Sequence, residues 1–128
     1  MSASSKSISY DRIFSDESGE SHFGRVGVDL SSTNYAPPAP PLDVSTPDSA
    51  ERVLFFRAPV GWTGDFHPSP RRQIYFGLSG SIEVTTSDGE MRVFPPGSVV
   101  LLEDTHGKGH RTQVVGDTES RGAFVHLE

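Results

Sequence analysis

Glycine and proline interrupt the sequence at short intervals from about residue 50 to the C-terminus, and this spacing limits the folds open to the chain. The 128 residues include 13 glycines and 10 prolines, whereas the two types together make up roughly 12 per cent of an average protein. Both types break helices, and the runs between them are rich in β-branched and aromatic residues, which favour strands. Short strands separated by turns every 8–12 residues or so are typical of sandwiches and barrels. The sequence therefore predicts one all-β domain.

The predicted strands begin with one early run and continue in close succession after residue 50. The clearest signal is Asp88-Gly89, which lies between two alternating runs, because this pair supplies the positive φ angles of a tight hairpin turn. No segment has the apolar periodicity of a long amphipathic helix. Strands are expected over residues 23–30, 52–57, 73–78, 81–86, 90–94, 99–102, 110–115 and 123–127.

The first fifty residues differ in composition from the rest of the chain. Residues 1–21 carry many serines and few apolar anchors, so we expect a flexible N-terminal segment that could dock on a partner, followed by the barrel domain over residues 22–128. Residues 31–50 contain five of the ten prolines. Because proline lacks a backbone N–H, this stretch is predicted to be an ordered, extended connector without ladder pairing.

Charge and composition exclude several functional classes. Seventeen acidic and eleven basic residues give a net charge of −6, which disfavours nucleic acid and anionic membranes as partners. There is no cysteine, so disulfides, a thiolate nucleophile and a zinc finger are excluded. The N-terminus lacks the apolar run of a signal peptide, and no stretch reaches the ~18 apolar residues of a spanning helix. A cytoplasmic protein is expected.

Two short motifs carry the residues suited to chemistry. The first has a glycine, a histidine, a serine, a glutamine and a second glycine at fixed intervals: Gly61, His67, Ser69, Gln73 and Gly80. It resembles the first motif of the cupin superfamily, G-x5-H-x-H-x3,4-E-x6-G, with serine and glutamine in place of the second histidine and the glutamate. Residues 105–110 resemble the end of the second cupin motif, P-x-G-x2-H, with Thr105 in place of proline. The resemblance covers about residues 52–115 and implies a cupin-like double-stranded β-helix, or jelly-roll barrel.

Alternation along the strands places the candidate site residues on shared faces, since residues two apart in a strand face the same way. The groups are Asp65 with His67 and Ser69, Gln73 with Tyr75, and His110 with Thr112. If these faces line one barrel, its interior holds a polar cluster that is costly to bury unless it is hydrogen-bonded or binds something. The expected substrate contacts are Ser69, Trp62, Arg71 and Thr112.

The resemblance also implies a metal, because cupins with the complete motif hold iron, manganese, nickel or zinc through three imidazoles and a carboxylate. The matching positions here are His67, Ser69, Gln73 and His110, of which His67, Gln73 and His110 are the candidate ligands, and no carboxylate remains among them to offset the charge of the ion. Asp65 could restore a set of two histidines and one carboxylate. In the alternative interpretation both histidines are buried and satisfied by their neighbours. No organic cofactor is expected.

Without a metal, His67 and His110 can still exchange protons with a substrate, while Gln73 and Tyr75 orient or polarise a carbonyl or hydroxyl. This set favours a lyase, isomerase or cyclase acting on a small oxygenated molecule, such as one of secondary metabolism. The alternatives are a metal-dependent dioxygenase and a non-catalytic small-molecule binder or sensor. A homodimer is expected, because cupin-like chains often associate through exposed strand edges.

Overall fold

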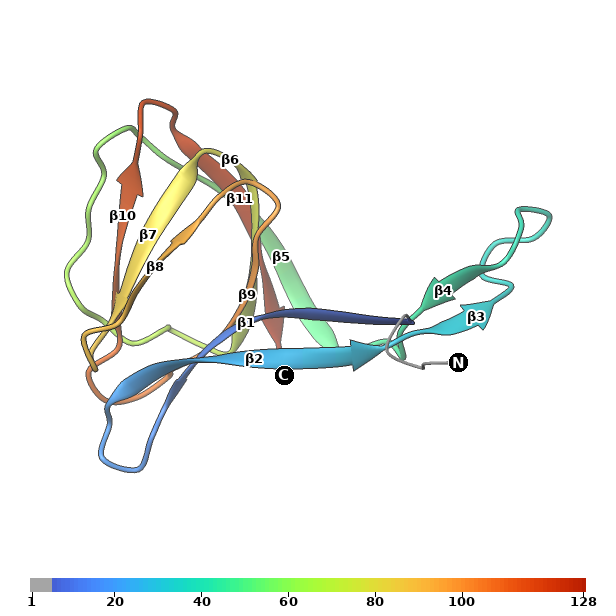
Figure 1. The fold of residues 1–128 in the computed structure, drawn as a ribbon, viewed down its shortest axis with the longest axis horizontal. Helices are drawn as coiled ribbons and strands as arrows, with labels where there is room; N and C mark the ends of the chain where they lie inside the picture. Colours follow the sequence, from blue (N-terminus) through green and yellow to red (C-terminus); the bar gives the residue numbers. More distant parts are fainter. Residues whose placement is uncertain (1–5) are drawn as a thin grey trace.

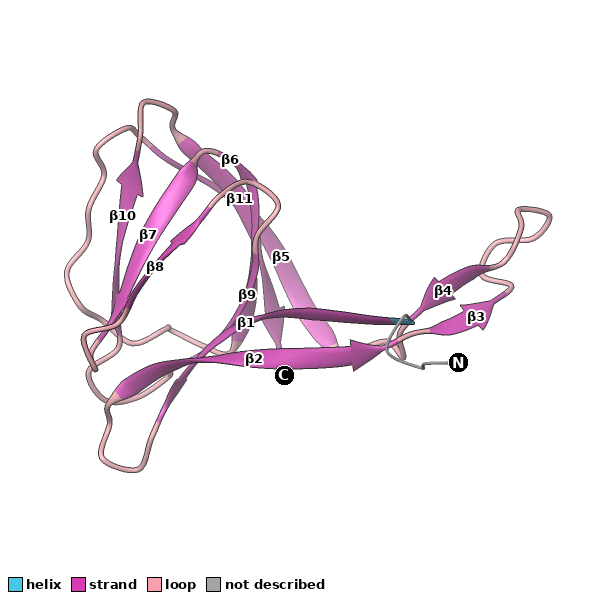
Figure 2. Ribbon diagram, viewed as in Figure 1, coloured by secondary structure: helices cyan, strands magenta, loops and turns pink. Residues whose placement is uncertain are grey.

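Strands account for the regular structure of the protein. A computed structural model describes residues 6–128. The named elements within them are all strands, and the one helical residue, Lys6, directly precedes the first strand (Figure 2). This part of the chain contains no helix long and apolar enough to cross a membrane. In order, the strands of residues 6–128 are β1 (Ser7–Ser15), β2 (Ser21–Asp29), β3 (Ser31–Thr33), β4 (Leu42–Val44), β5 (Ala50–Ala58), β6 (Gln73–Ser79), β7 (Ser81–Thr86), β8 (Met91–Phe94), β9 (Val99–Glu103), β10 (His110–Val115) and β11 (Ser120–Leu127).

Two sheets face each other across the core of the described residues (Figure 1). The larger has the strand order β2-β1-β9-β6-β11-β5, and the smaller has the order β10-β7-β8. All the pairs are antiparallel except β1 with β9. Because alternate residues of each strand face inward, an apolar cluster lies between the sheets: Ile13, Tyr75, Ile82, Val84, Phe94, Val100, Leu102 and Val114. The all-β prediction is confirmed, and each predicted strand range overlaps an observed strand.

The N-terminal segment belongs to the larger sheet. β1 pairs with β2 on one side and with β9 on the other, and the side chain of Ile13 is only 1% exposed. Residues 7–15 therefore form a strand, which differs from the flexible segment predicted for residues 1–21; residues 1–5 lie outside the described residues. The support for this strand comes from β9, which is distant in the sequence, so local composition does not reveal it.

Residues 31–44 form a hairpin that projects from the barrel, and we call this hairpin the arm. β3 pairs with β4 in antiparallel register from Ser31 and Val44 to Thr33 and Leu42, and Figure 1 shows the arm at the end of the molecule farthest from the barrel. The prediction of a connector without ladder pairing is therefore wrong for β3 and β4. Four prolines lie in the loop between these strands, where a missing N–H removes no ladder hydrogen bond.

The predicted hairpin between β7 and β8 is confirmed. The N–H of Gly89 donates to the carbonyl of Thr86 at 3.0 Å, and the N–H of Thr86 donates to the carbonyl of Glu90 at 3.0 Å. Gly89 has a φ of 94°, a conformation that glycine adopts without the steric cost of a Cβ. The turn residues that mark this hairpin in the sequence are thus the ones that the backbone requires.

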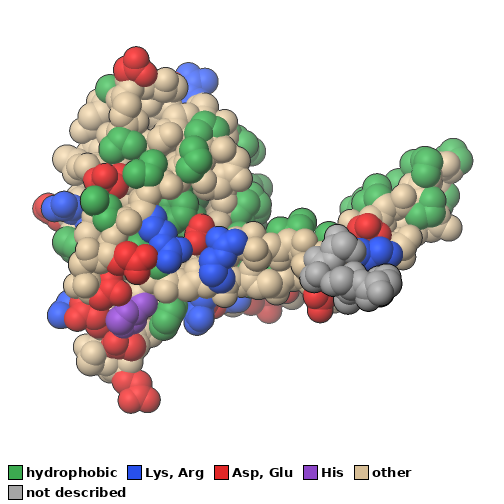
Figure 3. Space-filling model, in the orientation of Figure 1, with side chains coloured by type: hydrophobic (Ala, Val, Ile, Leu, Met, Phe, Trp, Pro, Cys, Tyr) green, Lys and Arg blue, Asp and Glu red, His purple; other side chains and the backbone are tan. Residues whose placement is uncertain are grey.

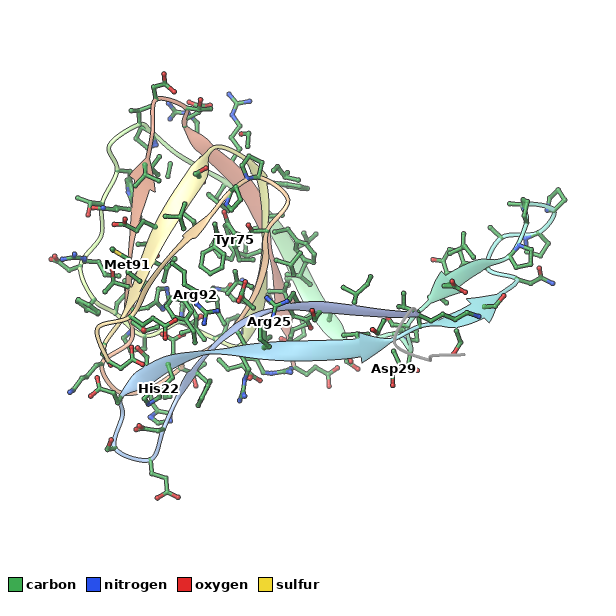
Figure 4. All side chains as sticks on the ribbon, in the orientation of Figure 1. His22, Arg25, Asp29, Tyr75, Met91 and Arg92 are labelled. Atoms are coloured by element: carbon green, nitrogen blue, oxygen red, sulfur yellow. The ribbon has the colours of Figure 1, made fainter. Side chains whose placement is uncertain are left out.

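His22, labelled in Figure 4, ties the turn between β1 and β2 to the β7–β8 hairpin. Its Nε2 lies 2.7 Å from Oδ2 of Asp16, and its Nδ1 lies 2.9 Å from Oδ2 of Asp88. The hydrogen bond to Asp16, and then that to Asp88, raises the pKa of His22 above its ordinary value of 6.5. The hydrogen bond with His22 is likewise the main cause that lowers the pKa of Asp16. Since only a protonated ring donates from both nitrogens, the imidazolium bridges two carboxylates.

We expect His22→Gln to destabilise the protein below the ordinary pKa of histidine and to have little effect well above it. A raised native pKa contributes stability that is present below the unfolded pKa and is lost as the pH rises through the native pKa. Urea unfolding of both proteins across a pH series measures the difference. In an Asp16→Asn background, the loss of unfolding free energy caused by His22→Gln should depend less on pH. If His22→Gln in the native background changes the unfolding free energy by the same amount at every pH, the bridge is contradicted.

Candidate functional site

A cavity of about 460 Å³ lies between the two sheets. This volume falls within the range of roughly 300–1,000 Å³ that is usual for small-molecule sites. Both sheets contribute apolar walls: Ile13, Leu54, Phe56, Ile82, Val84, Val100, Leu102, Val114 and Phe124. A ligand in this cavity would therefore make most of its contacts with hydrocarbon side chains, and a few polar groups would fix its orientation.

Most of the side chains predicted for the site do line this cavity: Trp62, His67, Ser69, Gln73, Tyr75, His110 and Thr112. Trp62 is 42% exposed and so belongs to the cavity wall rather than to the buried core. Asp65 and Arg71 are not among the lining residues. The cavity also includes residues that the sequence did not single out, above all Ser120 and His126.

His67 and His110 are brought together by their backbones. The N–H of each donates to the carbonyl of the other, at 3.1 Å and 3.0 Å, and the centroids of their rings lie 5.4 Å apart. Gly109 permits this approach, because a Cβ at that position would overlap the backbone of His67 and Pro68. The segment before β6 and the start of β10 thus place both imidazoles in the wall of one cavity.

Asp104 holds the ring of His110 in a fixed orientation. Its Oδ2 lies 2.6 Å from Nδ1 of His110, and the two residues are 0% and 6% exposed. Because Nδ1 is engaged by the carboxylate, Nε2 is the ring nitrogen left for a bound molecule. Acidic residues in a glycine-rich loop are usually solvated, but this loop returns the chain so that the carboxylate of Asp104 is buried against His110.

Gln73, Ser69 and His67, which line the cavity near His110, each form a hydrogen bond with a neighbouring group. Nε2 of Gln73 donates to Oγ of Ser69 at 3.3 Å, and Oγ of Ser69 donates to the carbonyl of Arg71 at 2.7 Å. Nδ1 of His67 donates to the carbonyl of Pro68 at 2.8 Å. These bonds fix the orientation of the amide and of the imidazole, and they leave Nε2 of His67 as the nitrogen that can exchange a proton.

Tyr75 lies inside the barrel between the two sheets (Figure 4). Burial raises the pKa of its phenol, and the neighbouring hydroxyl of Ser120 offsets only part of this effect. The two hydroxyls do not form a hydrogen bond of good geometry, and both are buried without a partner among the described residues. The phenol is therefore neutral near physiological pH and can donate a hydrogen bond.

The donor set at this site does not fit a tightly held divalent metal. Residues 6–128 contain no group of three or more histidine, cysteine, aspartate or glutamate side chains placed to hold a metal ion. Asp65 is exposed and lies outside the lining of the cavity, so it does not supply the carboxylate that the alternative set required. Asp104 is engaged by His110. His67 and His110 would bind an ion with only the amide of Gln73 to assist them.

The two arginines after Pro70 point to different partners. Nη1 of Arg71 donates to Nδ1 of His126 at 3.2 Å and lies 3.4 Å from Oε1 of Glu51. Arg72 instead binds Glu103 at 2.7 Å. His126 lines the cavity and Arg71 does not, so Arg71 is joined to the cavity wall only through its hydrogen bond to His126; its contact with a substrate stays a prediction.

The chain is similar to known proteins in its fold and not in its sequence. No protein-family model matches the sequence, and no curated protein is significantly similar to it. The cupin domain of Cnp3 from Schizosaccharomyces pombe aligns with a TM-score of 0.51 at 16% identity, over 95% of this chain and 83% of that chain. A cupin 2 conserved barrel domain protein from Salinispora arenicola aligns with a TM-score of 0.49 at 18% identity, over 79% of this chain and 76% of that chain. The alignment with the cupin domain of Cnp3 shows that the chain has the fold of a small cupin-type domain, as its motifs predict.

Proposed function

We propose that this cupin-type domain is an enzyme that performs acid–base chemistry on a small, oxygenated organic substrate. The observation that carries the proposal is the buried pair of Asp104 and His110 in the wall of a largely apolar cavity. A carboxylate that fixes the tautomer of a histidine is the arrangement that positions a general base. The reactions that suit it are elimination, double-bond shift and ring closure beside a carbonyl.

In this proposal His110 is the base and His67 the acid. Nε2 of His110 takes a proton from the carbon beside the carbonyl, and the electron pair of the broken C–H bond moves onto the carbonyl oxygen. Tyr75 donates a hydrogen bond that stabilises the charge on that oxygen. His67, whose ring lies beside that of His110, starts the step as the imidazolium, with its Nδ1 proton on the carbonyl of Pro68. It donates the Nε2 proton to the leaving group or to the rearranged carbon and becomes neutral, while His110 has become the imidazolium.

The apolar walls restrict the substrate to a molecule with a hydrocarbon body and few oxygen atoms. Most lining side chains are aliphatic or aromatic; His67, Ser69, Gln73 and His110 are polar groups of one end, and Arg57 and Ser120 line the cavity near the other end of β11. A highly hydroxylated sugar or a phosphate ester would leave polar groups buried against hydrocarbon, which costs several kcal/mol, roughly 1–3 for each unpaired group. A cyclic ketone or a ketide-like molecule meets the requirement.

Proton abstraction can be tested before the natural substrate is known. The protein is incubated in deuterium oxide with 2-tetralone, an apolar bicyclic ketone, and mass spectrometry measures deuterium gained beside the carbonyl relative to buffer alone. We expect His67→Ala and His110→Gln to fold normally and to lose about 100-fold or more of the acceleration. His110→Gln is chosen because an amide can still donate to Asp104. His106→Ala, an exposed histidine outside the cavity, is the control; unchanged exchange in both site variants would overturn the proposal.

A non-catalytic binder is the second candidate, and the predominantly apolar wall of the cavity favours it. In that case 2-tetralone or a related ketone binds without accelerated exchange, and the two histidine variants bind it as tightly as the native protein. The dioxygenase alternative is separated by elemental analysis of protein purified without a chelator or a nickel column, together with oxygen uptake in the presence of substrate.

A further inference from the structure

His126 is a third imidazole in the wall of the cavity, and the reaction proposed above does not use it. It lies in β11 directly opposite Gln73 of β6, and both residues line the cavity. Because opposite residues of an antiparallel pair share one face of the sheet, His126 belongs to the same end of the cavity as Gln73. Among residues 6–128, the one hydrogen-bond partner of its ring is Arg71, on Nδ1. Its Nε2 is not buried and is left for a ligand.

Arg71 determines which nitrogen of His126 carries the proton. Nη1 of Arg71 lies 3.2 Å from Nδ1 of His126, and a guanidinium has donors but no acceptor. Nδ1 is therefore the acceptor in this hydrogen bond, and the ring proton is on Nε2. His126 thus offers an N–H group at Nε2, so the ligand group that it binds is a hydrogen-bond acceptor.

The charges around His126 favour an acceptor that is negative. The guanidinium of Arg71 contacts the ring, and Arg52 stands opposite His126 in β5. Glu51 lies 3.4 Å from Arg71, but it is exposed, so solvent screens this pair. Two cations beside one end of the cavity stand out in a chain of net charge −6, and Figure 3 shows acidic side chains interleaved with basic ones on the face of the barrel that it draws. A carboxylate supplies both the acceptor oxygens and the negative charge that this position fits.

We propose that His126 binds a carboxylate of the substrate, and that Arg71 is a positioning residue that fixes the ring and contributes positive charge. This inference deepens the proposed function, on which it rests for the reaction at a carbonyl. Tyr75 follows Gln73 by two residues, which is about 7 Å along β6. Several carbon atoms therefore separate the carboxylate at His126 from the carbonyl oxygen at Tyr75. The substrate class is a keto acid with an apolar body.

Equilibrium dialysis of the full chain against 2-naphthoate and 2-naphthamide tests the carboxylate site, because the two probes share their shape and differ in charge. We expect the native protein to bind 2-naphthoate about 10-fold more tightly, since a hydrogen bond to a charged group is the stronger one. His126→Leu should bring the two affinities within about 2-fold of each other. His126→Gln should keep most of the preference, because an amide can accept from Arg71 and donate to the carboxylate. Circular dichroism checks that each variant folds.

Arg71→Met and Arg72→Met form a matched pair, because each removes one positive charge and Arg72 binds Glu103 instead of His126. Only Arg71→Met should lower the preference for 2-naphthoate, by about 3-fold or more. The inference is overturned if the native protein binds 2-naphthoate no more tightly than 2-naphthamide, if His126→Leu leaves the preference intact, or if Arg72→Met lowers it as far as Arg71→Met does.

Deuterium exchange into 2-tetralone, which has no carboxylate, tests the proposed function separately. Accelerated exchange without a preference for 2-naphthoate overturns the carboxylate site alone. A preference that depends on His126, without accelerated exchange, supports the carboxylate site and overturns the acid–base reaction.

Discussion

Gly109→Ala is expected to prevent folding of the barrel or to destabilise it by at least ~4 kcal/mol. Gly109 has a φ of 72°, and a Cβ there would overlap the backbone of His67 and Pro68. Those backbone atoms cannot move aside easily, because His67 and His110 are joined by two reciprocal hydrogen bonds. The steric overlap therefore adds to the ~1–2 kcal/mol that the left-handed conformation alone costs a residue with a Cβ.

Gly89→Ala and Gly97→Ala are the matched controls for this prediction. Both glycines have positive φ, 94° and 90°, and a Cβ at either position would have no heavy atom within 4 Å. Each control should lower the free energy of unfolding by about 1–2 kcal/mol, which is the cost of the left-handed conformation for a residue with a Cβ. Urea unfolding gives the three values, with far-UV circular dichroism to detect a variant that does not fold. If Gly109→Ala costs no more than Gly97→Ala, the close approach of the two histidine segments is not required.

Asp104→Ala is expected to destabilise the protein by about 3–5 kcal/mol and to remove the proposed exchange activity. Removing one partner of a buried pair leaves the other without its hydrogen bond in a medium that cannot replace it. The carboxylate of Asp104 is fully buried, and it is the acceptor of the Nδ1 proton of His110. In the variant, the ring of His110 is no longer held, so its Nε2 loses the orientation that the base requires.

Glu103→Ala is the control, because it removes the neighbouring carboxylate, which binds Arg12 and Arg72 at a partly exposed position. Such ion pairs contribute little, so about 1 kcal/mol is expected. The double variant Asp104→Ala/His110→Ala should cost less than the sum of the single variants, with a coupling of about 0.5–3 kcal/mol. Additive costs would show that the two side chains do not act as a pair.

The strands of the barrel were predictable because their signals are local. Asp88-Gly89 marks a hairpin through backbone conformations that these residues adopt readily, and the alternation over residues 81–86 is that of a strand with one buried face. β1 was not predictable in the same way, since its place in the sheet depends on pairing with β9. The ladder of β3 and β4 was missed because the prolines that argue against pairing lie in the loop between them.

The candidate site was predictable as a set of residues but not as a set of contacts. The cupin-like spacing placed His67, Gln73 and His110 in one cavity, and they line it. Alternation along a strand grouped Asp65 with His67. Residues 59–72 do not form a continuous strand, so residues two apart there need not face the same way, and Asp65 lies outside the cavity. The sequence held one sign of the pairing of Asp104 with His110, which is the presence of Gly107 and Gly109 between them. In the structure both glycines have positive φ, and this lets the loop turn back.

By itself, the sequence determined that the chain is all β and where the barrel strands lie, because turn chemistry and alternation act over a few residues. The resemblance to the cupin motifs placed His67 and His110 in one cavity but gave no sign of His126. Only the tertiary structure decided that Asp104 is buried against His110, that Asp65 stays outside the cavity and that Arg71 binds His126 in its wall. These properties arise when segments distant in the sequence meet, and burial and hydrogen bonding are set by the neighbours that each side chain then has.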